Sequence, residues 1–272
     1  MKVKIPWSHF FLLAVVLGSL LPLIWMLSTA WKTPEQVFQD SLNLWPHPAT
    51  ASNFAYVMRA VPLARYILNT LVIAALVTAA KMFTSVLAAY GFTQFTFRGR
   101  ETLFYLCLLS LFVPFTVTMV PNYLFVSRMG WLNTYTGVAL PQMADALGIF
   151  LLRQSIRSLP ASLVEAARLD RVGHSRILRC VLLPLIRPSL IALSILFFIN
   201  TWNEYFWPLL ILNNKNMYTL PLALQVFTNI EGGTNWGAMM AAATLASLPP
   251  LLAYLLAQRY VIDTFVQSGL KG

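Results

Sequence analysis

Long apolar runs alternate with shorter polar segments along this chain of 272 residues. A helix that crosses a bilayer needs about 20 mainly apolar residues. This criterion predicts six transmembrane helices, over Phe10–Trp31, Tyr66–Ala89, Leu103–Val120, Gly137–Leu152, Leu190–Leu212 and Gly237–Gln258. The fourth run is the shortest and contains the charged residue Asp145. The pattern predicts an all-α polytopic membrane protein with a single transmembrane domain over residues 1–272.

The first run admits a second interpretation, as a secretory signal peptide. The small residues Ser28-Thr29-Ala30 are compatible with a cleavage site. The apolar core of this run is longer than that of a usual signal peptide, however, and it contains Pro22. We therefore expect an uncleaved membrane anchor.

Composition supports a membrane location. Hydrophobic residues make up 58% of the chain and charged residues only 10%, whereas an ordinary soluble domain is about 45–50% apolar and about 25% charged. So few charges cannot cover the surface of a water-soluble protein of this size. Much of the apolar surface must therefore face lipid.

The net charge of +10 reflects where the basic residues lie. Six spans place both termini on one side of the membrane, and Lys and Arg concentrate in cytoplasmic segments. With the N-terminus inside, thirteen of the nineteen basic residues are cytoplasmic, five are external, and Lys81 lies in the second span. This distribution predicts that both termini are cytoplasmic, and it accounts for the charge without nucleic-acid binding.

The sequence lacks the signatures of catalysis and of cofactor binding. No Gly-rich loop ends in Lys-Ser or Lys-Thr, so the chain is not expected to bind the phosphates of ATP itself. His9, His47 and His174 lie in separate segments, and Cys107 and Cys180 form neither a disulfide framework nor a metal-binding pattern. We expect no enzyme activity, no metal and no bound cofactor.

The cytoplasmic segment 153–187 holds seven of the nineteen basic residues and a pattern typical of a short helix. Ser162, with Glu165 three residues later, predicts a capping box that begins this helix. Ala166 and Ala167 favour helix and allow another surface to approach closely. We therefore expect a short helix exposed to the cytoplasm, where it offers a docking surface for another protein.

A second helix is predicted further along this segment. Glu165 and Arg168 are spaced to pair on the first helix. Gly173 predicts the end of that helix, and Ser175 predicts the cap of the next one. The second helix carries an apolar stripe, formed by Ile177, Leu178, Val181 and Leu182. Such a stripe is typical of a helix that lies on the membrane surface.

Glu165-Ala166-Ala167, Asp170 and Pro184 stand at the spacing of the EAA loop. In these positions the chain resembles the permeases of binding-protein-dependent ABC importers, in particular the second permease of maltose-type carbohydrate transporters. Three further stretches resemble that branch: Phe97–Arg100, Trp202–Pro208 and Asn235–Gly237.

The resemblance implies an ABC type I importer permease fold in a prokaryotic inner membrane. It implies that the loop contacts an ATPase subunit through Glu165, Ala166, Ala167, Arg168, Asp170 and Gly173. It also implies that the C-terminal tail contacts the ATPase pair through Ser268, Gly269 and Lys271. The implied partners are a second, non-identical permease, two ATPase subunits that hydrolyse ATP, and an external substrate-binding protein.

One position departs from the family pattern. The family has glycine directly after the aspartate of the loop, but here Arg171 follows Asp170. Arginine does not readily adopt the positive φ angles that glycine allows. We therefore expect the turn to be shifted toward Gly173 or replaced by continued helix.

Ionisable groups inside the predicted spans are candidates for a functional role, because they are costly in lipid. Lys81, Asp145 and Glu204 are of this kind. If the fifth span is one helix, Asn200, Asn203 and Glu204 share a face. Such a face lines a wet pathway or seals a subunit interface or, equally, forms only interhelical hydrogen bonds.

Aromatic residues near these groups are the remaining candidates. Trp202, Tyr205, Phe206, Trp207 and Trp236 can stack against sugar rings, whereas aromatic residues near span ends more often form an interfacial belt or pack. The candidate pathway set is Asn200, Asn203, Glu204, Tyr205 and Trp236.

Together these features predict a permease subunit that forms half of the pathway of an ATP-driven importer for a sugar or related small polar solute. The alternative is a secondary transporter driven by an ion gradient, with Lys81, Asp145 and Glu204 as its ion relay. The lack of evident repeated halves favours the importer. Maltodextrins, trehalose, other sugars and glycerol phosphates all fit this branch.

Overall fold

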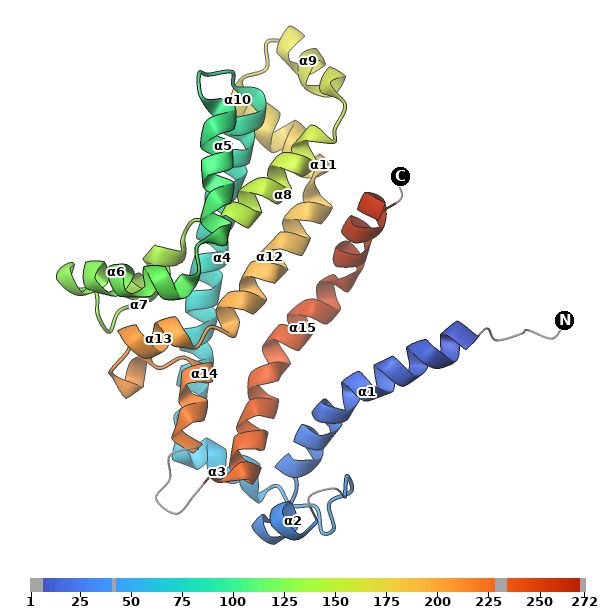
Figure 1. Cartoon of the computed structure of the whole chain (residues 1–272), viewed down its shortest axis with the longest axis vertical. Coiled ribbons are helices and arrows are strands. Elements are labelled where there is room, and N and C mark those ends of the chain that lie inside the picture. The colour runs from blue at the N-terminus through green and yellow to red at the C-terminus, as the bar shows by residue number, and fades with distance from the viewer. Residues whose placement is uncertain (1–6, 41–42, 228–233, 270–272) are drawn as a thin grey trace, which may run out of the picture. The chain divides into compact units, whose positions relative to one another are not determined.

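The computed structural model describes residues 7–40, 43–227 and 234–269 (Figure 1), with backbone alone for Ser8 and residues 260–269. The described residues form helices and no strand, which confirms the all-α prediction. The chain divides into two compact units. The first comprises Met1–Ile67 and Leu220–Leu248, and the second comprises Leu68–Thr219 and Pro249–Gly272.

The first unit contains the helices from both ends of the chain. They are α1 (Trp7–Ala30), α2 (Pro34–Gln39), α3 (Ser52–Ala60), α14 (Leu220–Ala223), η5 (Leu224–Phe227) and the first part of α15 (Trp236–Gly269). Local polar contacts define their ends. Thr33 and Gln36 form a capping box with Pro34 in the first turn of α2. The Asn53 amide nitrogen donates to the carbonyls of Ala30, 3.0 Å away, and Lys32, 2.8 Å away, at the end of α1.

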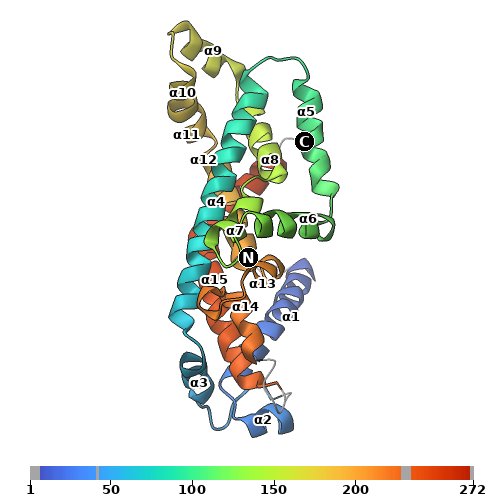
Figure 2. The same cartoon turned by 90° about the vertical axis from the view of Figure 1, so that its left-hand side faces the viewer.

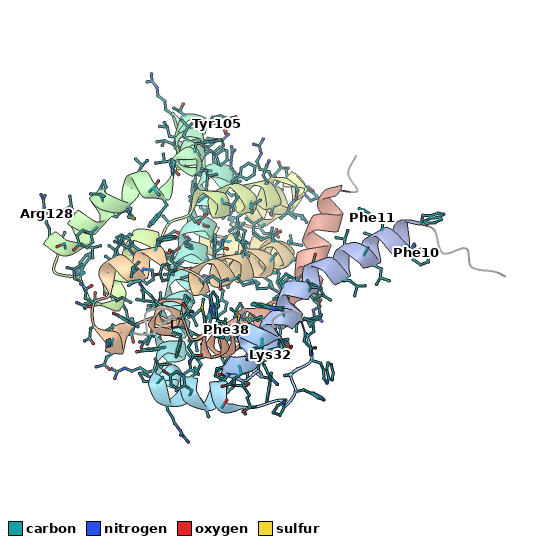
Figure 3. All side chains as sticks on the ribbon, turned by 60° about the horizontal axis from the view of Figure 1, so that its bottom comes forward. Phe10, Phe11, Lys32, Phe38, Tyr105 and Arg128 are labelled. Carbon is teal, nitrogen blue, oxygen red and sulfur yellow. The ribbon has the colours of Figure 1, made fainter. Side chains whose placement is uncertain are left out.

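The side chains of α1 are exposed along most of its length. Figure 3 shows Phe10 and Phe11 projecting from this helix; their exposed fractions are 59% and 70%. The window of α1 with the highest hydropathy is not buried within the protein at all. A helix that is apolar on all sides and unpacked in its own unit suits a lipid environment or a helical partner.

The second unit contains the middle of the chain, from within α4 to the residue before α14, and the last part of α15. Its helices are the main part of α4 (Leu63–Gln94), then α5 (Arg100–Leu109), η1 (Ser110–Phe112), α6 (Phe115–Arg128), α7 (Tyr135–Ala139), η2 (Leu140–Gln142), α8 (Ala146–Arg157), α9 (Ala161–Leu169), α10 (His174–Arg176), the π-helix η3 (Ile177–Leu182), α11 (Leu183–Leu185), α12 (Arg187–Trp202), α13 (Phe206–Ile211), η4 (Lys215–Met217) and the end of α15.

The described residues contain three single helices that are long and apolar enough to span a membrane, and three bent pairs that bring the number to six if each pair is one span. The single helices are His9–Ala30, Leu63–Gln94 and Trp236–Arg259. The first two bent pairs overlap the third and fourth predicted spans. The third pair overlaps the fifth predicted span, Leu190–Leu212, only through Arg187–Trp202, and its bend lies before that span. The bends measure 99° between Arg100–Phe112 and Phe115–Arg128, 48° between Tyr135–Gln142 and Ala146–Arg157, and 82° between His174–Leu185 and Arg187–Trp202.

Backbone chemistry accounts for the first of these breaks. Pro114 lies between η1 and α6 in an extended conformation, with φ −60° and ψ 140°. Proline has no N–H to continue a helix and disfavours helical geometry in the residue before it. Figure 2 shows α6 running across the direction of α5 as a result.

An apolar core joins five helices of the second unit: α4, α8, α9, η3 and α12. Its buried members are Ala89, Tyr90, Leu152, Ile156, Val164, Ile177, Leu182, Ile186, Leu193 and Phe197. The stripe predicted to face the membrane surface therefore packs on protein instead, because Ile177 and Leu182 are each 1% exposed. This core fixes the short helices of the cytoplasmic loop against the ends of longer ones.

Gly137 permits a close approach that a larger residue would prevent. A Cβ atom at this position would collide with the Trp131 carbonyl oxygen. We expect Gly137→Ala to destabilise the protein by about 1–3 kcal/mol, the usual cost of overpacking. The measurement is thermal unfolding in detergent, with Gly91→Ala as the matched control, because a Cβ at Gly91 meets nothing within 4 Å. Equal unfolding temperatures for the two variants would contradict this prediction.

Candidate functional site

The helix α9 lies in the loop that is predicted to be cytoplasmic, and it contains the Glu165-Ala166-Ala167 motif. It begins at Ala161, with Pro160 as the capping residue and no side-chain cap. The predicted capping box is therefore wrong, since Ser162 is already inside the helix. Pro160 fits the position before the helix, because no helical hydrogen bond requires an N–H there, and its φ of −58° with ψ 127° is the non-helical conformation of a residue that precedes a helix.

The turn that ends α9 lies at Arg171, where the family has glycine. Arg171 adopts φ +54°. Its N–H donates to the Arg168 carbonyl at 2.9 Å, and the Val172 N–H donates to the Ala167 carbonyl at 3.0 Å. These two bonds form a Schellman motif with Arg171 in the left-handed position. The expectation of a shifted turn or continued helix is wrong, because the hydrogen bonds of the motif retain the turn despite the arginine.

A glycine at position 171 is expected to stabilise this turn. Arginine in left-handed geometry costs about 1–2 kcal/mol, and the larger backbone entropy of glycine offsets about 0.5–1 kcal/mol of that, so Arg171→Gly should gain about 0.5–1 kcal/mol. The measurement is hydrogen–deuterium exchange of the α9 amides, which should slow. Gly173→Ala is the control, since Gly173 has φ −68° and open space around its Cβ position. Faster exchange in Arg171→Gly would indicate that the arginine side chain itself holds the loop.

The helix α9 has one buried face and one exposed face. Val164 is 8% exposed and packs in the apolar core, and Ala167 packs against that core. Glu165 and Ala166 are exposed on the opposite side. Leu169 is 84% exposed, one helical turn from them. Sequence reasoning missed Leu169, although its spacing of four residues from Glu165 and three from Ala166 places it on their face.

The remaining predicted loop residues have different surroundings. Asp170 is exposed at the C-terminal end of α9. Arg168 donates to the carbonyl and to the side-chain oxygen of Gln94, both at 3.2 Å, and in the described part of the chain it forms no ion pair with Glu165. Gly173 is the cap of α10 with no side-chain bond, so the predicted cap at Ser175 is wrong.

Two of the three charged groups predicted inside the spans form an ion pair. Lys81 Nζ lies 3.1 Å from Asp145 Oδ2. The other carboxylate oxygen of Asp145 accepts the N–H groups of Leu147 at 3.0 Å and Gly148 at 3.2 Å. Asp145 therefore caps α8 and neutralises Lys81 at once. The ammonium also lies 5.1 Å from the centre of the Phe197 ring, within cation–π range.

The candidate pathway residues lie around a break in the fifth predicted span. Helix α12 ends at Trp202 and α13 begins at Phe206, so Asn200, Asn203 and Glu204 do not share one continuous helix, contrary to expectation. Asn200 and Asn203 are exposed and Tyr205 is half-buried. The Glu204 carboxylate accepts the Trp207 N–H at 3.3 Å and so helps to begin α13.

Three aromatic candidates can now be placed. Trp202 and Trp207 are each 1% exposed, and Trp207 Nε1 donates to the Val138 carbonyl at 3.1 Å. Both therefore pack inside the second unit and cannot stack on a solute in this conformation. Trp236 begins α15 in the first unit and is 41% exposed.

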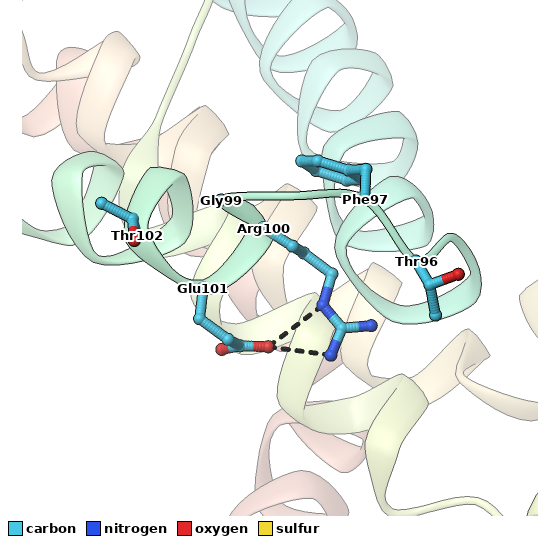
Figure 4. Close-up of a pocket in the computed structure, with 6 residues that line it drawn as sticks. All are labelled: Thr96, Phe97, Gly99, Arg100, Glu101 and Thr102. Carbon is cyan, nitrogen blue, oxygen red and sulfur yellow. Dashed lines mark hydrogen bonds and ion pairs between the residues drawn. The ribbon is translucent and has the colours of Figure 1, made fainter.

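A hollow of about 330 Å³ lies where α4 gives way to α5 (Figure 4), lined by Thr96, Phe97, Gly99, Arg100, Glu101 and Thr102. Arg100 and Glu101 pair across it at 3.1 Å. One guanidinium nitrogen of Arg153, Nη2, donates to both carboxylate oxygens of Glu101, each at 2.7 Å. Arg153 is 5% exposed and stacks 3.8 Å from the centre of the Phe104 ring. These contacts join α5 to α8.

Comparison with known proteins identifies the class of protein to which this arrangement belongs. Residues 81–265 match the family described as "Binding-protein-dependent transport system inner membrane component". The chain belongs to this family. It is therefore a multi-pass inner-membrane permease. The predicted resemblance to the permeases of binding-protein-dependent importers is confirmed, and the matched residues include α9, Lys81 and Asp145.

Named relatives match nearly the whole permease. The sn-glycerol-3-phosphate transport system permease protein UgpE of Yersinia pestis bv. Antiqua (strain Antiqua) is 35% identical over 267 residues, which are 96% of this chain and 95% of that protein. The protein of the same name from Agrobacterium fabrum (strain C58 / ATCC 33970) is 30% identical over 269 residues, with the same coverage. Such relatives are transport permeases and not enzymes.

Solved structures share the fold of the permease. A chain of a bacterial ABC transporter involved in the import of the acidic polysaccharide alginate superposes with a TM-score of 0.82 at 23% identity, over 96% of this chain and 99% of that one. A chain of the bacterial alginate ABC transporter in complex with an alginate pentasaccharide-bound periplasmic protein superposes with a TM-score of 0.69 at 15% identity, over 94% of each chain. The expected importer permease fold is confirmed.

The predicted tail contact of the permease lies outside the described side chains. Helix α15 extends to Gly269, but the side chain of Ser268 is not described and Lys271 lies beyond the described residues. The contact of these residues with an ATPase stays a prediction.

Proposed function

We propose that this permease forms half of the translocation pathway of an ATP-driven importer and contacts an ATPase subunit through α9. The observation that carries the proposal is the division of α9 into a buried face and an exposed one. Glu165, Ala166 and Leu169 are exposed together on a helix whose opposite face is fixed in the core. An exposed leucine beside a carboxylate and a small residue suits insertion into a cleft of a partner protein.

The proposed partners are a second, non-identical permease, two ATPase subunits and an external substrate-binding protein. The family description supports a binding protein, and one structural neighbour was solved in complex with a periplasmic protein that carries its ligand. ATP would be hydrolysed by the ATPase subunits, because this chain has no phosphate-binding loop. The tail residues Ser268, Gly269 and Lys271 would add a second contact with those subunits.

The proposed substrate is a sugar or a related small polar solute. The relatives named above are permeases for sn-glycerol 3-phosphate, and the structural neighbours import a polysaccharide. Asn200, Asn203, Glu204 and Tyr205 supply amide, carboxylate and aromatic groups at or near the break between α12 and α13. Groups of this kind bind hydroxyls and stack on sugar rings.

The test is purification of the full chain from its native membrane with the proteins that bind it. We expect an ATPase to co-purify and its rate to rise severalfold when the binding protein and one of maltose, trehalose or sn-glycerol 3-phosphate are added. Recovery of no ATPase would refute the proposal. A transporter driven by an ion gradient would instead continue uptake into vesicles without ATP and lose it when an ionophore is added.

A further inference from the structure

The last turns of α4 hold the loop of α9 and α10 at two points. Figures 1 and 2 both place α9 and α10 at the same end of α4. Before the Schellman turn, Arg168 donates two hydrogen bonds to Gln94. After the turn, the Tyr90 hydroxyl oxygen lies 2.9 Å from His174 Nδ1 and 3.3 Å from the His174 carbonyl oxygen. We call these residues, with Phe95, the α4 clamp.

Aromatic packing reinforces the second point of the clamp. The Phe95 ring centre lies 4.8 Å from that of His174, and the Tyr90 ring meets the Phe95 ring edge-on at 5.8 Å. His174 is thus held by a hydroxyl group and by two rings. On either side of these two points along the chain, Val164 and Ile177 pack with Ala89 and Tyr90 in the apolar core. Rotation of α9 about the end of α4 would have to break both points and open this core.

The same helix also holds the break in the fourth predicted span. Thr84 Oγ1 donates to the Met143 carbonyl at 2.9 Å, and Lys81 pairs with Asp145. Residues 143–145 are the short connection between η2 and α8. One straight helix, α4, therefore contacts the α9 loop at its end and a helix break nearer its middle.

We infer that the α4 clamp makes α9 and α4 move as one rigid body, so that a displacement of α9 reaches the membrane through α4 and arrives at the break before α8. This inference rests on the proposed function, since it is an ATPase that would displace α9. Tyr90, Gln94 and Phe95 are positioning residues in this scheme. They act through Arg168 and His174 and need not touch the ATPase or the solute.

The competing route follows the chain itself. Helix α9 continues through α10 and the π-helix η3 into α11 and α12. A π-helix has wider and weaker turns than an α-helix and often marks a functional site. If displacement travelled along this covalent route alone, α9 and α4 would separate when an ATPase closes. The distance between α9 and α4 therefore distinguishes the two routes.

The experiment measures that distance by double electron–electron resonance spectroscopy, which gives the distribution of distances between two spin labels in the full complex. The native cysteines, Cys107 and the exposed Cys180, are replaced by serine. Labels are attached to new cysteines at Leu71 on α4 and Leu163 on α9, which are 44% and 41% exposed. Leu71 lies about 27 Å along the helix from Ala89 at 1.5 Å per residue, so the pair falls within the measurable range.

With the clamp intact, we expect one narrow distance distribution that is the same without nucleotide and with ATP plus vanadate. Tyr90→Phe combined with Gln94→Ala should at least double the width of the distribution and make its mean depend on nucleotide. Thr93→Val is the matched control, because the Thr93 hydroxyl binds only carbonyls of its own helix. This control should leave both the width and the mean unchanged.

Two results would overturn the inference. One is a mean distance that changes with nucleotide while the clamp is intact, and the other is a double variant whose distribution equals that of the control. Failure of the proposed function gives a different result, because no ATPase would then co-purify with the chain. The nucleotide-free width still tests the clamp in that case, since it depends only on contacts within this chain.

Discussion

Replacement of Glu165 by lysine is expected to lower solute uptake by about tenfold to a hundredfold while the chain remains in the membrane. Glu165 is exposed on the outer face of α9 and has no ion-pair partner among the described residues. A charge-assisted contact with an ATPase would contribute about 1.5–3 kcal/mol, and reversal of the charge replaces it by repulsion. Insertion should persist, because an added cytoplasmic lysine agrees with the predicted orientation.

Two variants make the Glu165 experiment specific. Glu165→Gln retains the shape but not the charge, so its uptake should lie between those of the lysine variant and the unmodified chain. Ser175→Lys places a lysine at an exposed position of the loop outside α9 and should transport normally. The measurements are uptake into cells and the amount of ATPase that co-purifies. Normal uptake in Glu165→Lys would show that α9 does not carry the contact.

Apolar run length predicted the first, second and sixth spans as single long helices, whereas the third, fourth and fifth predicted runs fall on helices that bend or break. Each predicted run contains helix, because about 20 apolar residues can be stable in lipid only with their backbone bonds satisfied internally. The bends depend on local chemistry that a hydropathy count ignores. Pro114 ends one helix and begins another, and Asp145, which marked the fourth run as unusual, is the cap that restarts a helix after a break.

The motif was enough to locate the candidate loop in the sequence. The exact ends of its helices could not be predicted, because neighbouring residues compete for the same cap positions. Ser162 and Ser175 both suit a helix cap, but Pro160 and Gly173 precede them and take those positions. Arg171 adopts the left-handed conformation because two backbone hydrogen bonds and the packing of Val172 on the core outweigh its intrinsic cost. Propensity rules score each residue by itself and cannot weigh such tertiary contacts.

The partner of Arg168 illustrates what a single sequence cannot supply. Helical spacing suggested Glu165, three residues away, but the guanidinium reaches Gln94, which lies 74 residues earlier in the chain. The contact satisfies the last turn of α4, whose carbonyl groups have no helical donor. It also leaves Glu165 exposed for another protein. The exposed Leu169 was missed for a related reason, since a leucine in an amphipathic helix is normally assigned to the buried face.

Loss of the Lys81 side chain is expected to destabilise the permease strongly. In Lys81→Met the Asp145 carboxylate keeps its two backbone donors but loses its counter-charge in a mostly buried site, where the two side chains are 14% and 22% exposed. Removal of one partner of a fully buried pair costs about 3–5 kcal/mol, and the residual exposure here reduces the expected loss to about 1–3 kcal/mol. The measurement is thermal unfolding of the purified chain in detergent.

A second substitution should restore most of the stability that Lys81→Met loses. In Lys81→Met/Asp145→Asn no charge remains at the site, and the asparagine oxygen can still accept the N–H groups of Leu147 and Gly148, because asparagine caps helices about as well as aspartate. We expect the double variant to unfold at a higher temperature than Lys81→Met alone. Asp145→Asn alone should be destabilised, since it leaves Lys81 uncompensated beside Phe197. Strictly additive losses would show that the two charges do not stabilise each other and that the cap alone holds α8 in place.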